Sequence, residues 1–234
     1  MIYCTTAEQL LPQLNNIKLL LTDPPYGQNW TDWDKSINTD NIWQLIEGSL
    51  ATDAYVIMTA QQPFASKLIH SSPLKFRQEL IWEKPNGTGQ VRYGPNRVHE
   101  NILIWYTGHP PYNPQMTEGT PYTWNSTRSK GETSIHKNTD VINNTGTRHP
   151  RSVQKVKQER GLHPTQKPTE LFEWLIQSYS NPGDLVCDPY LGSGTTAIAA
   201  ENTGRQFVGC EQNIEYCDVI KKRLRERLIN NCVV

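Results

Sequence analysis

The chain has 234 residues and no net charge at neutral pH, because its 23 acidic residues balance its 23 basic ones. That length allows one sizeable core, or one core plus an inserted lobe. No apolar run approaches the roughly 20 residues that a membrane-spanning helix needs, and no secretory signal pattern is visible. We therefore expect a cytoplasmic protein with no membrane partner.

Seven short apolar runs, rich in β-branched and aromatic residues, predict the strands. Several are apolar throughout, which is typical of strands covered on both faces and therefore of a largely parallel sheet. In chain order the runs span residues 2–4, 18–22, 54–59, 78–83, 100–107, 184–188 and 206–210.

Helical patterns alternate with these runs. The first begins at Thr6 with a sequence that resembles a capping box, and the second has Asp40 as its candidate cap. Apolar residues at helical spacing mark residues 171–179 and 217–228, and small residues follow a glycine-containing turn at 192–196. Strands alternating with helices predict an α/β doubly wound domain.

Residues 109–160 interrupt this alternation. They are rich in Pro, Asn, Thr and Gly and poor in aliphatic residues, so we expect an inserted lobe or loop that a partner orders. Within them, residues 126–160 have eight basic residues against three acidic ones, a net charge of +5. This excess is typical either of a polyanion-binding surface or of a solvated loop.

The five cysteines form no CxxC pair and are odd in number. Two of them, Cys187 and Cys210, fall inside the strand-like runs. This pattern indicates buried free thiols in a reducing compartment, in preference to a zinc site or a disulfide framework. We accordingly expect no bound metal.

The run at 18–22 ends abruptly in Asp23-Pro24-Pro25-Tyr26. Two consecutive prolines extend neither a sheet nor a helix, because each fixes φ and lacks a backbone donor. The corner therefore presents a carboxylate, a rigid backbone carbonyl and an aromatic ring at the tip of a strand. Taken alone, Asp23 in such a corner is also compatible with a capping role.

A second strand end carries the glycine-containing turn. The run 184–188 ends at Asp188, Gly192-Ser-Gly-Thr-Thr196 follows, and the next run leads to Glu211. Glycines allow close approach of the backbone, a helix N-terminus offers unpaired N–H groups, and an acid about 20 residues onward can hold ribose hydroxyls. This pattern indicates a nucleoside site.

With both strand ends considered, the chain resembles the DNA amino-methyltransferases that use S-adenosylmethionine, in their permuted β group. In that group the motif (D/S/N)PP(Y/F/W) precedes the cofactor motif, and a target-recognition region lies between the two. The resemblance implies a Rossmann-like, seven-stranded, mostly parallel sheet with one antiparallel strand and helices on both faces. Residues 1–108 would form the catalytic half, 109–160 the target-recognition region and 161–234 the cofactor-binding half.

The resemblance also implies the residues of the site. Asp23 and Pro24 would accept the N–H groups of an exocyclic amine, and Tyr26 would stack on a base turned out of the duplex. Lys167, in the segment that leads to the cofactor motif, would border the methionine end of the cofactor. The other implied cofactor-binding residues are Asp188, Tyr190, Gly192, Ser193, Gly194, Thr195, Thr196 and Glu211. The implied phosphate contacts are Arg128, Lys130, Lys137, Arg148, Arg151, Lys155 and Lys157.

Other residues have two interpretations. Trp30 and Trp33 either line the base site or pack beneath it. A structural role is the default for His99 and Glu100, which open a strand. Three further aromatic residues either stack on DNA or pack locally, namely Tyr112, Tyr122 and Trp124. Tyr190 stands where the family usually has phenylalanine, and Thr5-Thr6 stands where it often has Gly-Asp.

The implied activity is methylation of the N6 amine of adenine in double-stranded DNA. Aspartate at the first motif position is typical of the adenine enzymes, whereas serine is typical of the cytosine-N4 enzymes, which makes cytosine-N4 methylation the nearest alternative. An RNA amino-methyltransferase and a catalytically silent DNA-binding protein are further alternatives. The sequence leaves open the recognition site, a restriction partner and whether the protein is a homodimer.

Overall fold

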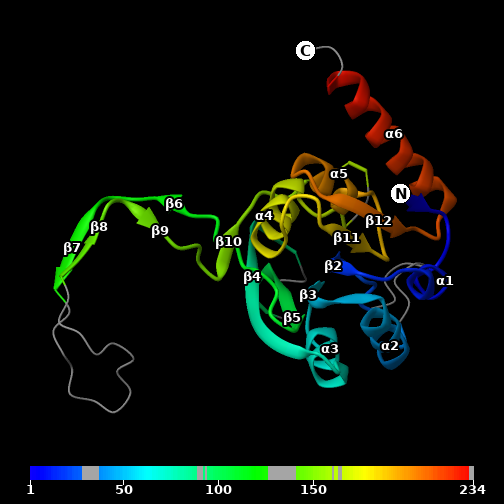
Figure 1. Cartoon of the computed structure of the whole chain (residues 1–234), viewed down its shortest axis with the longest axis horizontal. Helices are drawn as coiled ribbons and strands as arrows, with labels where there is room; N and C mark the ends of the chain where they lie inside the picture. Colours follow the sequence, from blue (N-terminus) through cyan, green and yellow to red (C-terminus); the bar gives the residue numbers. More distant parts are fainter. Residues whose placement is uncertain are drawn as a thin grey trace. The chain divides into compact units, whose positions relative to one another are not determined.

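The computed structural model describes residues 1–27, 37–88, 92, 94–125, 141–159, 161–162 and 165–231. The chain divides into a larger unit, Met1–Asn113 with Ser152–Val234, and a smaller unit, Pro114–Arg151. The larger unit contains one sheet flanked by helices, and the smaller unit contains short antiparallel ribbons (Figure 1). The smaller unit lies within the region 109–160, whereas residues 109–113 and 152–159 belong to the larger unit.

Eight described strands form the main sheet, in the order β1-β12-β11-β2-β3-β5-β4-β10. β5 runs antiparallel to both of its neighbours, and the other described pairs in this sheet are parallel. The predicted mostly parallel α/β sheet with one antiparallel strand is therefore confirmed. The strands are β1 (Ile2–Tyr3), β2 (Ile17–Thr22), β3 (Leu50–Ala60), β4 (Lys75–Thr88), β5 (Arg97–Thr107), β10 (Val153–Lys155), β11 (Leu185–Asp188) and β12 (Gln206–Cys210).

The eighth strand, β10, corrects the expectation of seven strands. It pairs parallel with β4, with Val153 opposite Ile81, and the Trp82 indole N–H donates a 2.9 Å hydrogen bond to the Val156 carbonyl. β10 has only three residues and no apolar run of its own, because it lies at the sheet edge and obtains its hydrogen bonds from β4. A sequence pattern based on buried strands could not reveal it.

Helices cover both faces of the sheet (Figure 1). On one face α1 (Ala7–Leu10), α2 (Thr39–Ser49) and α3 (Phe64–Ser71) share a core with the sheet. On the other face α4 (Thr169–Tyr179) and α5 (Thr195–Asn202) share a second core, and α6 (Ile214–Asn231) packs against α5. A 3₁₀ turn, Leu11–Gln13, follows α1.

The apolar spacing read from the sequence explains how these helices pack. Ile42, Trp43 and Ile46 of α2 are all buried, and the Trp43 ring meets the Trp105 ring of β5 edge-on at 4.9 Å between centroids. The predicted cap of α2 is wrong by two residues, because Asn38 accepts the first free N–H groups of the helix and Asp40 lies in its first turn.

Two further helix predictions differ from the structure. Thr6 occupies the N-cap position of α1, but its side chain makes no capping hydrogen bond. Helix α3 was not predicted, because its eight residues offer too few repeats for a helical period to stand out.

The described part of the smaller unit forms two antiparallel ribbons. One pairs β6 (Thr117–Glu118) with β9 (Thr147–Arg148), and the other pairs β7 (Tyr122–Asn125) with β8 (Val141–Asn144). A stretch that lacks the apolar residues for a separate core thus forms ribbons instead of a packed lobe.

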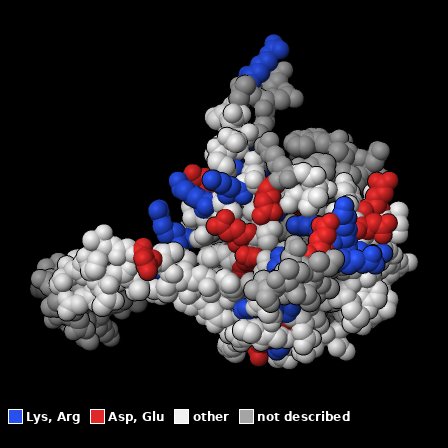
Figure 2. Space-filling view, turned by 90° about the horizontal axis from the view of Figure 1, so that it is seen from above, with Lys and Arg blue, Asp and Glu red and all other residues white. Residues whose placement is uncertain are grey.

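Charged side chains of both signs intersperse on the face shown in Figure 2. On α6, Lys221 lies 3.5 Å from Asp218 and Lys222 lies 3.9 Å from Glu226, and all four side chains are exposed. The basic run of this helix is thus largely a solvated surface. Among the described residues, no helix has the length and apolar character that crossing a membrane requires.

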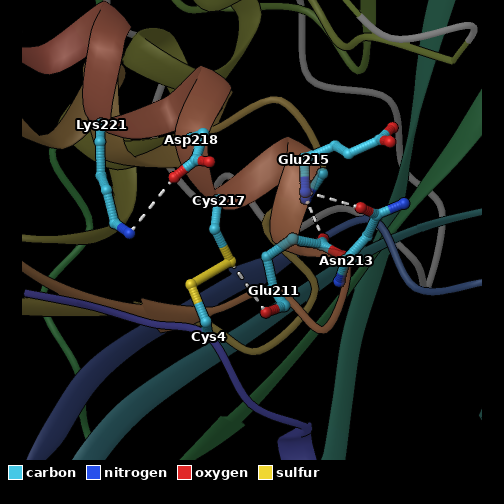
Figure 3. The surroundings of a disulfide bond; sticks show 8 residues. Cys4, Glu211, Asn213, Glu215, Cys217, Asp218 and Lys221 are labelled. Carbon is cyan, nitrogen blue, oxygen red and sulfur yellow. Dashed lines mark hydrogen bonds and ion pairs between the residues drawn. A yellow bond between two sulfur atoms is a disulfide. The ribbon is translucent and has the colours of Figure 1, made fainter.

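A disulfide joins Cys4, just after β1, to Cys217 in α6 (Figure 3). The expectation of free thiols is therefore wrong for this pair, because two cysteines separated by 213 residues leave no local spacing pattern. It is confirmed for Cys187 and Cys210, which are buried and unpaired. Cys232 lies outside the described residues. The Cys217 sulfur also lies 3.2 Å from the Glu211 carbonyl oxygen, so the disulfide is next to the second strand end.

Candidate functional site

Two loops of the larger unit meet because the strands that precede them are neighbours. β2 pairs parallel with β11, with Leu19 opposite Val186 and Leu20 opposite Cys187. The carboxyl ends of neighbouring parallel strands lie at the same edge of a sheet. The Thr22 hydroxyl donates a 2.5 Å hydrogen bond to Asp188 Oδ1 and so joins the two strand ends directly.

The Asp23 carboxylate is held by three side chains. Its Oδ1 accepts hydrogen bonds from the Tyr26 hydroxyl, at 2.8 Å, and from the Thr59 hydroxyl of β3. Its Oδ2 forms a 2.5 Å ion pair with Lys167 Nζ. Since the Asp23 side chain is 21% exposed, the carboxylate is fixed from the protein side and remains accessible.

Lys167 connects Asp23 to two further buried charges. Its Nζ lies 3.4 Å from Glu100 Oε2, and Glu100 Oε1 is ion-paired with Lys84. Burial alone would raise the pKa of Glu100, but the ammonium groups of Lys167 and Lys84 lower it below its ordinary value. Burial alone would lower the pKa of Lys167, but Asp23 and Glu100 raise it above its ordinary value. These shifts favour the charged forms of both Glu100 and Lys167, which lie in a cluster of two carboxylates and two ammonium groups.

Tyr26 lies over this cluster. Its ring packs on Phe64 at 5.6 Å between centroids, and its hydroxyl also lies 3.4 Å from Glu100 Oε2. Burial, reinforced by the negative charges of Asp23 and Glu100, raises the pKa of Tyr26 well above its ordinary value. Tyr26 is therefore a neutral hydrogen-bond donor that orients Asp23.

Asp188 is a buried carboxylate that fixes the second strand end. Besides Thr22, it accepts a 2.5 Å hydrogen bond from the Thr196 hydroxyl and a 3.0 Å bond from the Tyr190 backbone N–H. Burial raises the pKa of Asp188 to about 6, although these donors partly offset the shift. Its contacts make Asp188 the structural link between β2, the turn and α5.

The turn after Asp188 needs its glycines. Gly192 and Gly194 have φ values of +52° and +82°, which side chains disfavour, and a Cβ on Gly194 would lie 2.7 Å from Ile220 of α6. The Gly192 N–H donates a 2.9 Å hydrogen bond to Glu211 Oε2. Arg223 of α6, which sequence reasoning missed, donates a 2.6 Å bond to the Ser193 carbonyl.

These residues fit the nucleoside part of a methyl-donor cofactor. The turn brings the backbone close to the N-terminus of α5, and Glu211 stands opposite it at the end of β12. Each oxygen of Glu211 holds one backbone N–H, from Gly192 and from Asn213, so the carboxylate is oriented and keeps free lone pairs. A carboxylate in that state is able to accept ribose hydroxyls.

Lys167 also joins the two strand ends through its backbone. The Thr195 hydroxyl, in the first turn of α5, donates a 3.1 Å hydrogen bond to the Lys167 carbonyl, while the Lys167 ammonium lies on Asp23. The sequence predicted this residue at the cofactor. The structure places its backbone at the Gly192–Thr196 turn and its ammonium at the Asp23 corner.

The predicted DNA-contacting residues fall into three groups. Arg148 stacks over the Tyr122 ring at 4.7 Å and bonds to nearby ribbon atoms, and Lys155 pairs with Glu83 at 3.0 Å. Arg151 and Lys157 are exposed. The others, Arg128, Lys130 and Lys137, lie outside the described residues, as do Trp30 and Trp33.

The three aromatic residues for which the sequence left two interpretations have different environments in the structure. Tyr112 packs against Tyr179 of α4 at 5.4 Å between ring centroids, which favours local packing. Tyr122 and Trp124 lie on β7 and are 46% and 54% exposed. Their exposure keeps a role in stacking on DNA open for this pair.

The residues that sequence reasoning missed are mostly buried polar ones: Thr22, Thr59, Lys84, Glu100 and Arg223. One sequence feature could have indicated Lys84 and Glu100: each is a charged residue in or next to an apolar strand sequence, LIWEK for Lys84 and HENILIW for Glu100. Such charges are rarely buried without a partner, so each predicts another one nearby but cannot identify it.

Comparisons with known proteins agree with this geometry. A family model described as DNA methylase matches residues 17–222. The Type II methyltransferase M1.MboII of Moraxella bovis is 29% identical over 94% of both chains. The Type II methyltransferase M.HpaI of Haemophilus parainfluenzae is 28% identical over 94% of this chain and 73% of its own.

Solved structures share the fold. The M1.HpyAVI–SAM complex superposes with a TM-score of 0.66 at 22% identity and covers 95% of this chain and 98% of that one. The cytosine-N4-specific PvuII DNA methyltransferase gives a TM-score of 0.66 at 16% identity, covering 94% of this chain and 84% of its own.

The raised pKa of Asp188 predicts a pH-dependent stability. Because its folded-state pKa of about 6 exceeds the ordinary value of 3.8, the folded state binds the proton more tightly. Stability from this residue is complete below pH about 4 and is lost as pH rises to about 6, a decline of about 3 kcal/mol. In Asp188→Asn this decline should disappear from denaturant unfolding measured across that pH range. The exposed carboxyl variant Asp218→Asn should keep the wild-type decline, and an unchanged slope in Asp188→Asn would contradict the assignment.

A second prediction concerns the Tyr190 hydroxyl, which is buried and has no hydrogen-bond partner among the described residues. Removing an unsatisfied buried hydroxyl should stabilise, so Tyr190→Phe should raise the free energy of unfolding by about 1 kcal/mol. The matched control is Tyr179→Phe, whose hydroxyl accepts a 3.1 Å bond from Gln78 and whose loss should destabilise. Chemical denaturation compares the two, and a destabilised Tyr190→Phe would refute the prediction.

Proposed function

Since the chain belongs to the N6/N4 DNA methylase family, we propose that it methylates the N6 amine of a flipped adenine in double-stranded DNA. The chain is a DNA amino-methyltransferase that uses S-adenosylmethionine. The observation that carries the proposal is the direct link between Asp23 and the cofactor turn, through Thr22 with Asp188 and through Lys167 with Thr195.

The cofactor-binding assignment rests on the turn and on Glu211. We assign the turn Gly192–Thr196 and Asp188 to the cofactor, with Glu211 for its ribose hydroxyls and Tyr190 beside the turn. S-adenosylmethionine supplies, when bound, a methyl group activated by a sulfonium. The chain's own contribution is to hold the acceptor amine beside that group and to exclude water from it.

Asp23 and Pro24 address the weakness of an exocyclic amine as a nucleophile. Its lone pair is delocalised into the base, and acceptors on its two N–H groups favour the tetrahedral form that attacks. Asp23 offers a carboxylate oxygen and Pro24 a backbone carbonyl held rigid by the two prolines. Asp23 also receives the proton that the nitrogen loses on methylation.

The proposed contacts to the amine require the target base to leave the duplex. An amine inside a stacked base pair cannot contact both acceptors, and extrusion costs a few kcal/mol. Stacking on Tyr26 would return about 1–3 kcal/mol of this cost. Arg151 and Lys157, which are exposed, are assigned to phosphates together with the other basic residues of the region, and these contacts set register but not sequence.

Adenine is favoured over cytosine by the aspartate of the first motif. The similar solved structures include a cytosine-N4-specific enzyme, so the fold itself does not separate the two substrates. The relatives named Type II methyltransferases support a role in restriction-modification.

The product identifies the substrate base. Unmethylated genomic DNA treated with the protein and S-adenosylmethionine should yield N6-methyl-2′-deoxyadenosine on digestion to nucleosides and mass spectrometry. N4-methylcytosine would replace the adenine proposal by the cytosine one. Transfer of label to RNA but not to duplex DNA would overturn both.

Removing the acceptor should abolish turnover while leaving the cofactor site intact. Asp23→Ala should lower kcat by about 100-fold or more, because it removes a charge aligned with the transition state. The affinity for S-adenosylmethionine, measured by calorimetric titration, should change by less than about threefold. Asp40→Asn, an exposed carboxyl in α2, serves as the control with wild-type kcat. Retained turnover in Asp23→Ala would favour a different acceptor.

A further inference from the structure

Four charged residues, Asp23, Lys84, Glu100 and Lys167, form a buried cluster in the DNA-free protein. The side chains of Lys84, Glu100 and Lys167 are only 6–7% exposed. Buried charges of this kind are costly unless paired, and here two carboxylates meet two ammonium groups. A single acceptor for an amine does not need three partners of this kind, so the cluster calls for a further explanation.

The two lysines have different positions in the cluster. Lys84 is paired with Glu100 Oε1 and lies on β4 directly after Glu83, which pairs with His99 of β5. Lys167 lies between both carboxylates, 2.5 Å from Asp23 Oδ2 and 3.4 Å from Glu100 Oε2. The Thr195 hydroxyl holds the Lys167 backbone at the turn, so an exchange between Asp23 and Glu100 involves movement of the Lys167 side chain alone.

Glu100 has unused capacity to receive this ammonium. Among the described residues its Oε2 has two contacts, and both are long: 3.4 Å to Lys167 Nζ and 3.4 Å to the Tyr26 hydroxyl. Charge-assisted hydrogen bonds at full strength are about 2.7–2.9 Å long. A small movement of the Lys167 side chain would therefore exchange a strong bond to Asp23 for a strong bond to Glu100.

The exchange matters because Lys167 occupies the acceptor that the reaction needs. Asp23 Oδ1 already accepts from Tyr26 and Thr59, which leaves Oδ2 for the incoming amine. An ammonium on Oδ2 offsets the negative charge that would favour the amine, and it repels the positive charge that develops on the attacking nitrogen.

We propose that Glu100 is a positioning residue that takes the Lys167 ammonium from Asp23 when the target amine arrives. In the arrangement that the structure shows, Lys167 occupies Asp23 Oδ2 and so orients the carboxylate. When the amine binds Oδ2, Lys167 pairs with Glu100 Oε2, and Lys84 continues to neutralise the other side of Glu100. This inference rests on the proposed function, because it concerns the carboxylate that the amine is to meet.

The test compares the decrease in kcat that Glu100→Gln causes in three backgrounds: the wild type, Lys167→Met and Lys84→Met. In the wild-type background the variant leaves Lys167 with Asp23 as its one anion, and kcat should fall at least about tenfold. In a Lys167→Met background the same change should alter kcat by less than about twofold, because no ammonium remains to be moved. In a Lys84→Met background the full loss should persist.

The two double variants are matched in charge. Each lacks Glu100 and one lysine, so a merely structural role in balancing buried charge would be relieved equally by either lysine change. The readouts are kcat for tritium transfer from labelled S-adenosylmethionine to unmethylated genomic DNA, KM for that DNA, and the Kd of the cofactor. The loss should appear in kcat, with the cofactor Kd unchanged within about threefold.

Glu100→Asp provides a variant that keeps the charge and guards against a folding defect in Glu100→Gln. It should recover most of the kcat that Glu100→Gln loses. The inference is overturned if Glu100→Gln lowers kcat by the same factor in all three backgrounds, or if Lys84→Met and Lys167→Met reduce that loss equally. Complete inactivity of Lys167→Met would also overturn it. If the wild-type protein methylates no DNA, the proposed function fails as well. If it does, these outcomes remove only the inference.

Discussion

Thr22 and Asp188 end two neighbouring parallel strands, and the hydrogen bond between their side chains joins segments 166 residues apart in sequence. Everything in the site follows from this adjacency. A parallel sheet places the carboxyl ends of β2 and β11 at one edge, so the Asp23 corner and the Gly192–Thr196 turn lie next to each other. The buried Asp188 carboxyl holds β2, the turn and the start of α5 together by hydrogen bonds, and its burial raises its pKa.

The same edge imposes an electrostatic problem that Asp188 alone does not have. The Asp23 carboxylate must stay accessible, yet it is held by Tyr26 and Thr59 and paired with the buried Lys167. The structure balances it with Lys167, balances Lys167 with Glu100, and balances Glu100 with Lys84. Each buried charge requires a neighbour of opposite sign. The series of ion pairs therefore extends to Glu100 on β5 and ends at Lys84 on β4.

The sequence predicted those parts of the molecule that local patterns encode. The seven apolar runs correspond to seven strands of the sheet, and the Asp-Pro-Pro-Tyr corner and the Gly192–Thr196 turn were recognised from residue chemistry and order. The buried partners Lys84 and Glu100 were missed, because a charge inside a strand shows that a partner exists without showing which one. Strand β10 and the Cys4–Cys217 disulfide were missed for a related reason, since both depend on contacts between distant segments.

The segment that leaves the smaller unit is bound to the elements that carry the buried charges. β10 pairs with β4 up to Lys155 opposite Glu83, the residue before Lys84. A few residues later, Glu159 accepts hydrogen bonds from the Thr169 N–H at the start of α4, at 2.7 Å, and from Gln166 at 3.1 Å, next to Lys167. One short stretch, 153–159, therefore contacts both the strand of Lys84 and the loop of Lys167. Because the two lysines approach Glu100 from elements that this one stretch contacts, it helps to hold the strand of Lys84 and the loop of Lys167 at the buried cluster.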